Sequence, residues 1–310
     1  MQYLLPRRMF LKLATLAGLS FPLRGLTSQL SSPGSYIDDM GVQLFTVRNL
    51  ITDRPAETLK TIAEIGYKHV ELAGINNLQQ FIPMVKDAGL RVTSTHFPSV
   101  FVTGNWELWG KFGVSPLPEG KDVEHVIDYV QPYGIKYLVF PFLFPEERGG
   151  LEQFRLLADQ LNRAGEKCKQ AGIQFCYHNH NFEFNPQEGS SPFDIFISEL
   201  DPDLVKFEID VFWMANAGLD PVAWLTEHPG RCRLLHLKDL KPGTATAFDT
   251  SIPPDSFEEI GDGVIDFTSI LRTAFESGIE YCYVEQDQTP GDPLASLRQS
   301  YQYLNQLEIS

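Results

Sequence analysis

The sequence predicts a closed (β/α)8 barrel of parallel strands. From residue 41 to the C-terminus, amphipathic helical segments alternate eight times with short apolar segments, which is the pattern of a parallel α/β barrel. In five of these units a glycine ends the helix, one apolar residue follows, and a strand comes next. Glycine is favoured there because it adopts the left-handed backbone conformation without strain. The alternative is an open doubly wound sheet, but residues 43–48 lack the glycine-rich phosphate turn that normally follows its first strand.

The expected strands are short apolar runs that suit burial on both faces of a parallel sheet. The five units that begin with glycine are residues 66–72, 89–93, 134–140, 172–177 and 278–284, and three further strands are residues 41–45, 205–211 and 234–237. Helical periodicity predicts helices at residues 56–65, 78–88, 123–133, 151–170, 192–200, 221–227, 267–277 and 293–307. Two long connections, residues 98–120 and 241–259, are expected to cover the mouth of the barrel.

The N-terminal segment differs from the rest of the chain. The paired Arg7 and Arg8 precede a Phe-Leu-Lys phrase, residues 13–21 are mostly apolar, and no acidic residue occurs before Asp38. A positive segment followed by a short apolar run predicts an export signal of the twin-arginine type over residues 1–30, with an amphipathic anchor as the alternative. Residues 31–38 are then a linker and residues 39–310 the barrel domain. This predicts a periplasmic protein that keeps no stable membrane anchor after processing.

The composition excludes several classes of function. The formal charge is −15, from 25 basic and 40 acidic residues, so the protein lacks the basic surface that a nucleic-acid partner needs. With 43% hydrophobic and 21% charged residues, the chain is typical of a folded globular protein. Its four cysteines include no Cys-x-x-Cys pair, which excludes a zinc knuckle and a dithiol redox motif.

Polar side chains gather where the expected strands end, which is where barrels of this kind carry their chemistry. In chain order these residues are Gln43, Arg48, Glu71, His96, His178, His180, Glu183, Glu208, Asp210, His236, Lys238, Glu285 and Asp287. Several buried carboxylates at one mouth would repel each other, and a bound divalent cation removes this cost. Imidazole together with carboxylate suits Mn²⁺, Co²⁺, Fe²⁺ or Zn²⁺ better than Ca²⁺ or Mg²⁺. The sequence therefore predicts a divalent metal site.

Each of these residues also has a simpler interpretation. Asp210 alone is explained as a helix cap, Glu285 as the partner of a Lys or Arg, and His236 as a hydrogen-bonded core histidine. Glu208 is interpreted as a structural carboxylate of an inner layer, and His69 as a surface residue. The metal site is favoured because the simpler explanations must hold independently on four consecutive strands.

From about residue 40 onwards, the chain resembles the xylose isomerase-like TIM barrel proteins known as sugar phosphate isomerases/epimerases. The resemblance rests on phrases in a fixed order, at residues 41–48, 178–180, 208–213, 236–239, 260–267 and 284–287. It implies a divalent metal held by one side chain from each of the last four strands. Asp210, His236 and Glu285 match three of these positions. His178 takes the fourth, where the family usually has Glu, and His180 or Glu183 are the alternatives for it.

The resemblance also implies proton abstraction next to a carbonyl, by an isomerase or epimerase in which two carboxylates on opposite sides of the substrate exchange a proton. With His178 in place of Glu, this symmetric exchange is harder to build. A histidine base with Lys238 as the acid indicates the alternative of β-elimination by a lyase or dehydratase, on a keto-sugar or keto-glycoside. The expected catalytic residues are His180, Glu183, Lys238 and Glu285.

The expected substrate is an unphosphorylated sugar, keto-sugar or cyclitol, because Arg48 and Lys238 are the only obvious cations near the site. The expected substrate-binding residues are Gln43, Arg48, Glu71, His96 and Trp213. Further aromatic side chains expected near the mouth are Phe97, Phe101, Trp106 and Trp109. A third hypothesis, from another class, is an exported carbohydrate-binding protein without catalytic activity, which would bind sugar without a metal.

Overall fold

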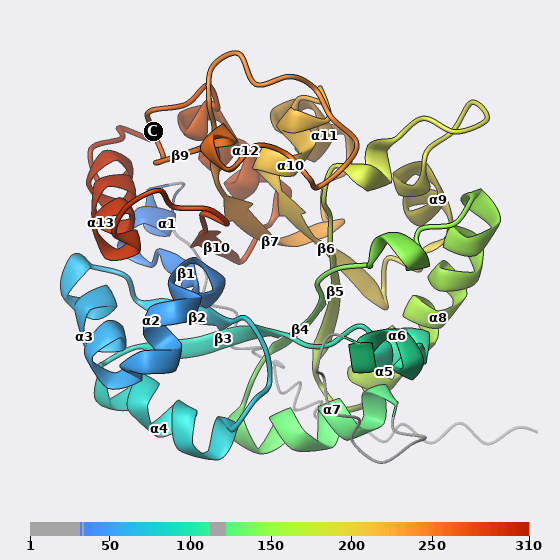
Figure 1. Ribbon diagram of the computed structural model, residues 1–310, viewed down its shortest axis with the longest axis horizontal. Helices are drawn as coiled ribbons and strands as arrows, with labels where there is room; N and C mark the ends of the chain where they lie inside the picture. Colours follow the sequence, from blue (N-terminus) through green and yellow to red (C-terminus); the bar gives the residue numbers. More distant parts are fainter. Residues whose placement is uncertain (1–31, 33, 112–121, 310) are drawn as a thin grey trace, which may run out of the picture.

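A computed structural model of the chain describes residue 32 and residues 34–111 and 122–309, and its centre is a closed barrel of parallel strands (Figure 1). The barrel strands are β1 Gly41–Gln43, β2 His69–Leu72, β3 Arg91–His96, β4 Tyr137–Phe140, β5 Gln174–His178, β6 Val205–Asp210, β7 Cys232–Leu237 and β10 Tyr281–Val284. Each strand pairs in parallel with the next, and β10 closes the barrel onto β1. The predicted (β/α)8 barrel is confirmed, whereas the predicted signal segment lies outside the described residues.

The helices that follow the strands lie around the barrel (Figure 1). They are α3 Pro55–Ile65, α4 Leu78–Asp87, α7 Val123–Val130, α8 Leu151–Gln170, α9 Pro192–Glu199, α11 Pro221–Glu227, α12 Phe267–Ser277 and α13 Pro293–Leu304. Shorter helices are α1 Ser35–Asp38, α2 Arg48–Asp53, α5 Val100–Thr103, α6 Trp106–Lys111 and α10 Val211–Asn216, and 3-10 turns are η1 Leu44–Val47, η2 Gln131–Tyr133, η3 Pro145–Glu147, η4 Phe182–Phe184 and η5 Pro254–Ser256. The glycines of the repeated phrase have φ values from 72° to 134°, as the left-handed helix end requires. No helix of the described part of the chain is long and apolar enough to span a membrane.

The first strand is shorter than expected. It ends at Gln43, and residues 44–47 turn away from the sheet as η1. The Gln43 side chain causes this turn, because its Oε1 accepts a hydrogen bond from the Phe45 backbone N–H at 3.1 Å. As a result Phe45 lies outside the sheet and is 39% exposed.

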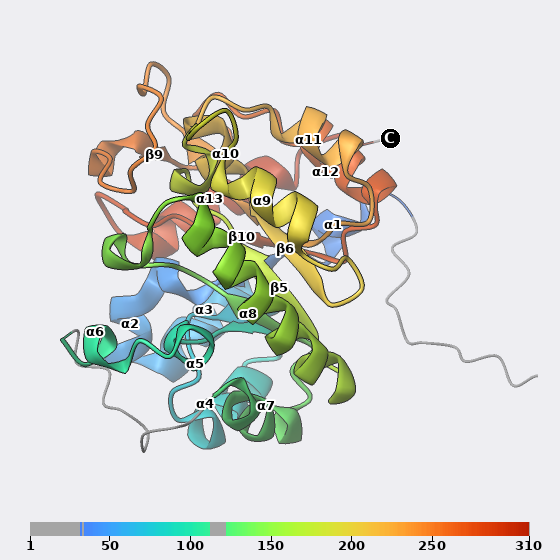
Figure 2. The same ribbon diagram turned by 90° about the vertical axis from the view of Figure 1, so that its right-hand side faces the viewer.

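Packing on the barrel begins within the expected linker. Residues 35–38 form α1, and the buried Tyr36 donates a hydrogen bond to the Ile279 carbonyl at 2.6 Å. Figure 2 shows α1 at one end of the barrel and α2, α6 and β9 at the other. The expectation that His69 lies on the surface is wrong. It is fully buried inside the barrel, and its Nε2 lies 2.8 Å from the Asp39 carbonyl oxygen.

Residues 241–256 form a long excursion between β8 Asp239–Leu240 and β9 Phe257–Glu258, which pair with each other as antiparallel strands. The Asp239 carboxylate closes the base of this excursion by accepting backbone hydrogen bonds from Leu240, Gly261, Gly263 and Ile265. A Cβ on Gly263 would lie 2.2 Å from the Asp239 Oδ1, so this position requires glycine. The phrases at residues 236–239 and 260–267 are therefore parts of one loop anchor.

Candidate active site

A cavity of about 470 Å³ opens among the carboxyl ends of the barrel strands. Of the predicted site residues, those that line it are His96, His178, His180, Trp213, Lys238 and Glu285. Asp210 and His236 are fully buried next to these residues. The excursion at residues 241–256 contributes Thr250, Ile252 and Pro254 to the wall, which agrees with its expected place over the mouth.

Asp210, His236 and Glu285 bring one ligand atom each within 4.8 Å of one another. His236 Nδ1 lies 2.7 Å from Glu285 Oε2 and 3.9 Å from Asp210 Oδ2. Asp210 Oδ1 caps α10 by accepting the backbone N–H groups of Phe212 and Trp213, which leaves Oδ2 facing His236. Asp210 can therefore fill both of its expected roles, because Oδ1 caps the helix while Oδ2 is placed to bind a metal.

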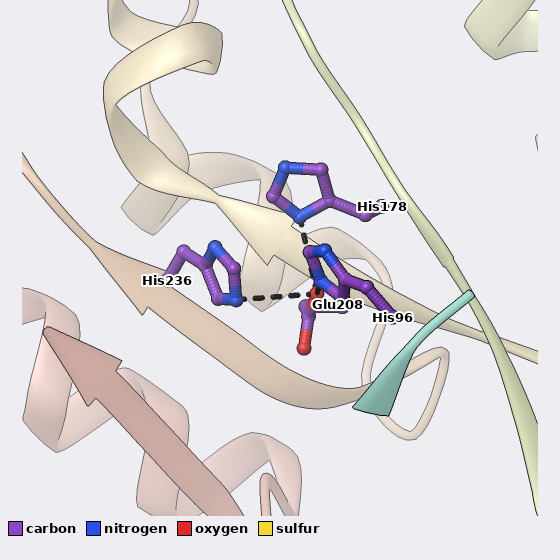
Figure 3. A group of neighbouring side chains, drawn as sticks. All are labelled: His96, His178, Glu208 and His236. Atoms are coloured by element: carbon purple, nitrogen blue, oxygen red, sulfur yellow. Dashed lines mark hydrogen bonds and ion pairs between the residues drawn. The ribbon is translucent and has the colours of Figure 1, made fainter. Parts of the chain in front are cut away.

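His178 joins this group from β5. Its Nε2 lies 3.8 Å from Asp210 Oδ2, whereas its Nδ1 lies 3.1 Å from Glu208 Oε2. His236 is arranged in the same way, because its Nε2 lies 3.2 Å from the same Glu208 oxygen. Figure 3 shows His96, His178 and His236 around Glu208. Histidines that bind a metal usually turn their second ring nitrogen to a carboxylate. Glu208 lies in such a place behind His178 and His236, although its hydrogen bond is with His96 Nε2, at 3.0 Å, and that of His236 Nε2 is with Glu71. This position fits the structural role expected for Glu208.

Glu71 and Gln43, which the sequence predicts to bind substrate, are fully buried and are not among the residues that line the cavity. Glu71 Oε2 lies 2.6 Å from His236 Nε2, and Gln43 donates a hydrogen bond to that oxygen at 2.8 Å. Ser94 donates to the other Glu71 oxygen. Both Gln43 and Glu71 are fully buried, because strand alternation and the turn at η1 direct them into the barrel rather than to its mouth.

The side chains fit a divalent transition metal. His178 Nε2, Asp210 Oδ2, His236 Nδ1 and Glu285 Oε2 make a mixed nitrogen and oxygen donor set. Although His236 Nδ1 and Glu285 Oε2 are 2.7 Å apart, the contact lacks hydrogen-bond geometry. Burial alone lowers the pKa of His236, but the Glu208, Glu285 and Glu71 carboxylates outweigh it and raise that pKa well above its usual range. Such an excess of negative charge favours a bound cation.

Lys238 supplies a cation to this group. Its Nζ lies 2.8 Å from Asp210 Oδ2, 2.7 Å from Glu285 Oε2 and 2.7 Å from Asp287 Oδ1. Burial lowers the pKa of Lys238, but the three carboxylates raise it well above its usual range, so the side chain is an ammonium. A metal held by Asp210 and Glu285 would compete with Lys238 for these two carboxylates, while Asp287 would remain as a partner of the ammonium.

His180 is a neutral imidazole at the cavity wall. Its ring lies between Phe142 and Trp213, at centroid distances of 5.1 Å and 5.3 Å. Burial, followed by the charges of Lys238 and Arg148, lowers its pKa well below the usual value. Its Nδ1 is buried and makes no hydrogen bond to any residue that the structure describes. A neutral imidazole at a cavity wall is suited to accept a proton.

Glu183 and Arg48 are not at the cavity, contrary to expectation. Glu183 accepts hydrogen bonds from the Tyr177 hydroxyl at 2.8 Å and the His180 backbone N–H at 2.9 Å, so both of its oxygens are engaged in holding the strand end. Burial raises its pKa to about 7. Arg48 is the first residue of α2, and its guanidinium packs over the Phe45 ring at 4.2 Å.

The aromatic wall differs from the expected one. Only Trp213 of the five predicted aromatic residues lines the cavity, together with Phe45, Phe142 and Phe257, and Asp287 adds a second carboxylate. Phe97 is buried against Phe175, and Trp106 and Trp109 pack against Phe101 and Phe144. Phe142 lies two residues beyond β4. The residues that end this strand are apolar, so the sequence alone did not indicate that one of them would line the cavity.

A closed parallel barrel with imidazole and carboxylate side chains converging at the carboxyl ends of its strands defines a (β/α)8 barrel protein with its site at the mouth. Residues 59–307 match the family described as xylose isomerase-like TIM barrel, and the chain belongs to this family.

The proteins that are similar to this chain have several different enzyme activities. The chain is 27% identical over 277 residues to an inosose dehydratase of Clostridium botulinum, covering 81% of this chain and 88% of that one. An inosose dehydratase of Geobacillus thermodenitrificans is 28% identical over 165 residues, and there the match spans 50% of this chain and 55% of the relative. A sugar phosphate isomerase/epimerase from Parabacteroides distasonis has a similar structure, with a TM-score of 0.71 and 26% identity over 92% of this chain and 99% of that one. The E. coli 3-keto-D-glucoside 4-epimerase shares the fold at a TM-score of 0.59 and 18% identity, over 81% and 94% of the two chains.

Proposed function

We propose that the protein is a metal-dependent lyase that eliminates an oxygen leaving group from an unphosphorylated keto-sugar or keto-cyclitol. His178, Asp210, His236 and Glu285 hold the metal in this proposal. When bound, a divalent metal would polarise the carbonyl oxygen and make the neighbouring C–H group more acidic. The similarity to inosose dehydratases supports a dehydration of this kind.

One observation favours elimination, namely the distribution of ionisable groups around the cavity. Both carboxylates that line it among the described residues, Glu285 and Asp287, follow β10. The side chains that follow β5 are the imidazoles His178 and His180, and β7 and β6 separate β5 from β10 in the barrel. An exchange between two carboxylates from opposite sides therefore lacks its second carboxylate. An imidazole base and an ammonium acid remain, which is the pair that an elimination requires.

In the proposed reaction, the His180 imidazole accepts the proton from the carbon next to the carbonyl. The electron pair of that C–H bond forms a C=C double bond, and the C–O bond on the adjacent carbon breaks with its electrons moving to oxygen. Lys238 donates a proton to the departing oxygen, so that water or an alcohol leaves. The products are an unsaturated ketone and the protonated leaving group, and no oxidant is needed.

The charges support an unphosphorylated substrate. Around the cavity, Lys238 is the permanent cation among the described residues, and three carboxylates surround it. A phosphate group binds well where free positive charge or helix N-termini face it, and this wall offers carboxylates and aromatic rings instead. Phe45, Phe142, Trp213 and Phe257 provide apolar faces that suit the C–H face of a sugar ring.

The test is product analysis by NMR in D₂O with the metal-loaded protein and a panel of keto-sugars and keto-cyclitols. A lyase gives an unsaturated product and a released leaving group. The second candidate, an isomerase or epimerase, is favoured by the similarity to the Parabacteroides distasonis structure and would return an isomer that carries deuterium next to the carbonyl. Sugar binding that is unaffected by metal removal, without turnover, would instead support the carbohydrate-binding hypothesis.

The export of the protein is a separate proposal. We propose that residues 1–30 direct it to the periplasm through the twin-arginine route, which the paired Arg7 and Arg8 support. Replacement of both by Lys should keep the full-length protein in the cytoplasm. Unchanged appearance in a periplasmic fraction would contradict the proposal.

A further inference from the structure

We propose that the substrate carries a second ring, which binds in a groove beside the barrel mouth. This inference rests on the proposed function, because it specifies the substrate of the same site as a glycoside of a keto-sugar rather than a free keto-sugar. The groove, which we call the side groove, has a volume of about 270 Å³ and lies between α2 and the segment that follows β2. The residues that characterise it are Leu44, Arg48, Ile51, Thr52, Asn76 and Phe81.

The side groove adjoins the main cavity. Ala73, the first residue after β2, is exposed and lines both spaces. A second contact joins the two spaces, because Arg48 of the side groove packs at 4.2 Å over the ring of Phe45, which lines the main cavity. A molecule with one ring in the main cavity can therefore extend past Phe45 into the groove without crossing bulk protein.

Phe45 and Arg48 make an aromatic ridge whose orientation is fixed. Arg48 Nη1 donates a hydrogen bond to the Phe45 carbonyl at 3.0 Å, and its guanidinium packs on the ring of the same residue. With 39% exposure, Phe45 is a large apolar side chain left open at the junction of two cavities. A ring held in this way loses little conformational entropy when a ligand stacks on it.

The chemistry of the groove suits a hydroxylated ring. Its apolar surface comes from Leu44, Ile51 and Phe81, and Thr52 and Asn76 add polar groups. Arg48 forms no ion pair with the described residues, so the guanidinium donors that do not bind Phe45 are available to hydroxyl groups. Apolar faces beside a few hydrogen-bond donors are the usual composition of a site for a small polar ring.

The test is a binding measurement that does not depend on turnover. Metal-loaded protein is titrated calorimetrically with methyl glycosides of glucose, galactose and xylose, and with the 4-nitrophenyl glycosides of the same sugars. At least one sugar is expected to bind ten-fold or more tightly as the two-ring compound. Arg48→Ala should remove most of this gain, and Thr52→Trp, which fills the groove, should remove it completely. Thr52→Trp should keep the affinity for the methyl glycoside, because Thr52 does not line the main cavity, and Leu156→Ala, at a 58% exposed position on α8, is the matched surface control.

Equal affinities for one-ring and two-ring compounds, or a gain that survives Thr52→Trp, would overturn the inference. Failure of the proposed function looks different, because the two-ring preference would then persist while no keto-sugar undergoes elimination. If a free keto-sugar undergoes elimination as efficiently as its glycosides, the proposed lyase activity is supported and the proposed second ring of the substrate is refuted. If no sugar of either class binds, both proposals fail.

Discussion

Glu208 Oε2 lies 3.1 Å from His178 Nδ1, and this contact determines which nitrogen of His178 faces the other candidate ligands. Because Nδ1 faces the buried carboxylate, Nε2 is directed to Asp210 at 3.8 Å. The same oxygen lies 3.2 Å from His236 Nε2, so one carboxylate faces both imidazoles from the side away from Asp210. Glu208 therefore lies behind the four candidate ligands His178, Asp210, His236 and Glu285.

Glu208→Gln should weaken metal binding without removing a ligand. The amide keeps the shape of the side chain but loses the charge that orients His178 and His236, and loss of such a partner typically costs about 10- to 100-fold in metal affinity. Competition with a metal indicator measures the affinity, and Glu107→Gln on the 90% exposed side chain is the control. An unchanged affinity would show that Glu208 does not support the ligands.

Two substitutions at Asp210 separate its two roles. Both Asp210→Asn and Asp210→Ala should lose the metal and the ion pair with Lys238, so both apo proteins should be less stable than wild type. Asp210→Asn can still accept the backbone N–H groups that begin α10, whereas Asp210→Ala loses the helix cap and should be about 1 kcal/mol less stable than Asp210→Asn. Elemental analysis and thermal unfolding of the metal-free variants provide the two measurements. Equal metal content in wild type and both variants would refute the site, and His236→Ala should likewise bind no metal.

Lys238→Met should act in opposite directions on the apo protein and on metal binding. Removal of the ammonium leaves Asp210, Glu285 and Asp287 without their cation, and breaking a buried ion pair on one side costs about 3–5 kcal/mol. The competing positive charge also disappears, so the metal should bind more tightly and should raise the melting temperature more than in wild type. Thermal unfolding with and without a chelator tests this. The elimination rate should fall, and a metal-loaded variant with full activity would exclude Lys238 as the acid.

His180→Asn should lower turnover about 10²- to 10⁴-fold, the usual contribution of a general base, while metal content stays at the wild-type level. By contrast, His178→Ala should lose both metal and activity, because His178 is the proposed fourth ligand. Comparison of metal stoichiometry and rate in the two variants assigns the roles. The assignment is wrong if His180→Asn loses the metal, or if His178→Ala retains it.

Glu183 should make stability decrease as the pH rises. Its pKa is raised from 4.5 to about 7 by burial, so the folded protein holds this proton more tightly than the unfolded chain. The resulting stabilisation is complete below pH 4.5 and is lost as the pH rises through 7, by about 3 kcal/mol if Glu183 acts alone. Glu183→Gln should flatten this part of the stability profile in urea unfolding at pH 5 to 8. Glu188→Gln, at an exposed position, should leave the profile as in wild type, and identical slopes in all three proteins would show that Glu183 does not cause the pH dependence.

The barrel could be predicted from the sequence because its signals are local. Repeated glycine-ended helices and apolar strands lie within a few residues of each other, and each expected helix agrees with an observed one to within a few residues. The candidate ligands were also accessible, since each ends a strand of a parallel barrel and such ends meet at one mouth. The sequence did not show that Arg48 lies outside the main cavity, because the turn after β1 depends on a hydrogen bond from the Phe45 backbone N–H to the Gln43 side chain, which leaves no sign in the periodicity.

By itself, the sequence determined the barrel, the edge at which the polar residues gather, and the donor types of a metal site. Only the tertiary structure decided which groups touch the substrate cavity and which stand behind it. Glu71 and His236 are 165 positions apart in the chain, yet their 2.6 Å contact places Glu71 beneath the site. Both oxygens of Glu183 likewise accept hydrogen bonds from residues at the end of β5, namely the Tyr177 hydroxyl and the His180 backbone N–H. Whether a side chain lines the cavity or lies behind it depends on the rotamers and hydrogen bonds that form when distant strands close into a barrel. The periodicity of the sequence does not reveal these contacts.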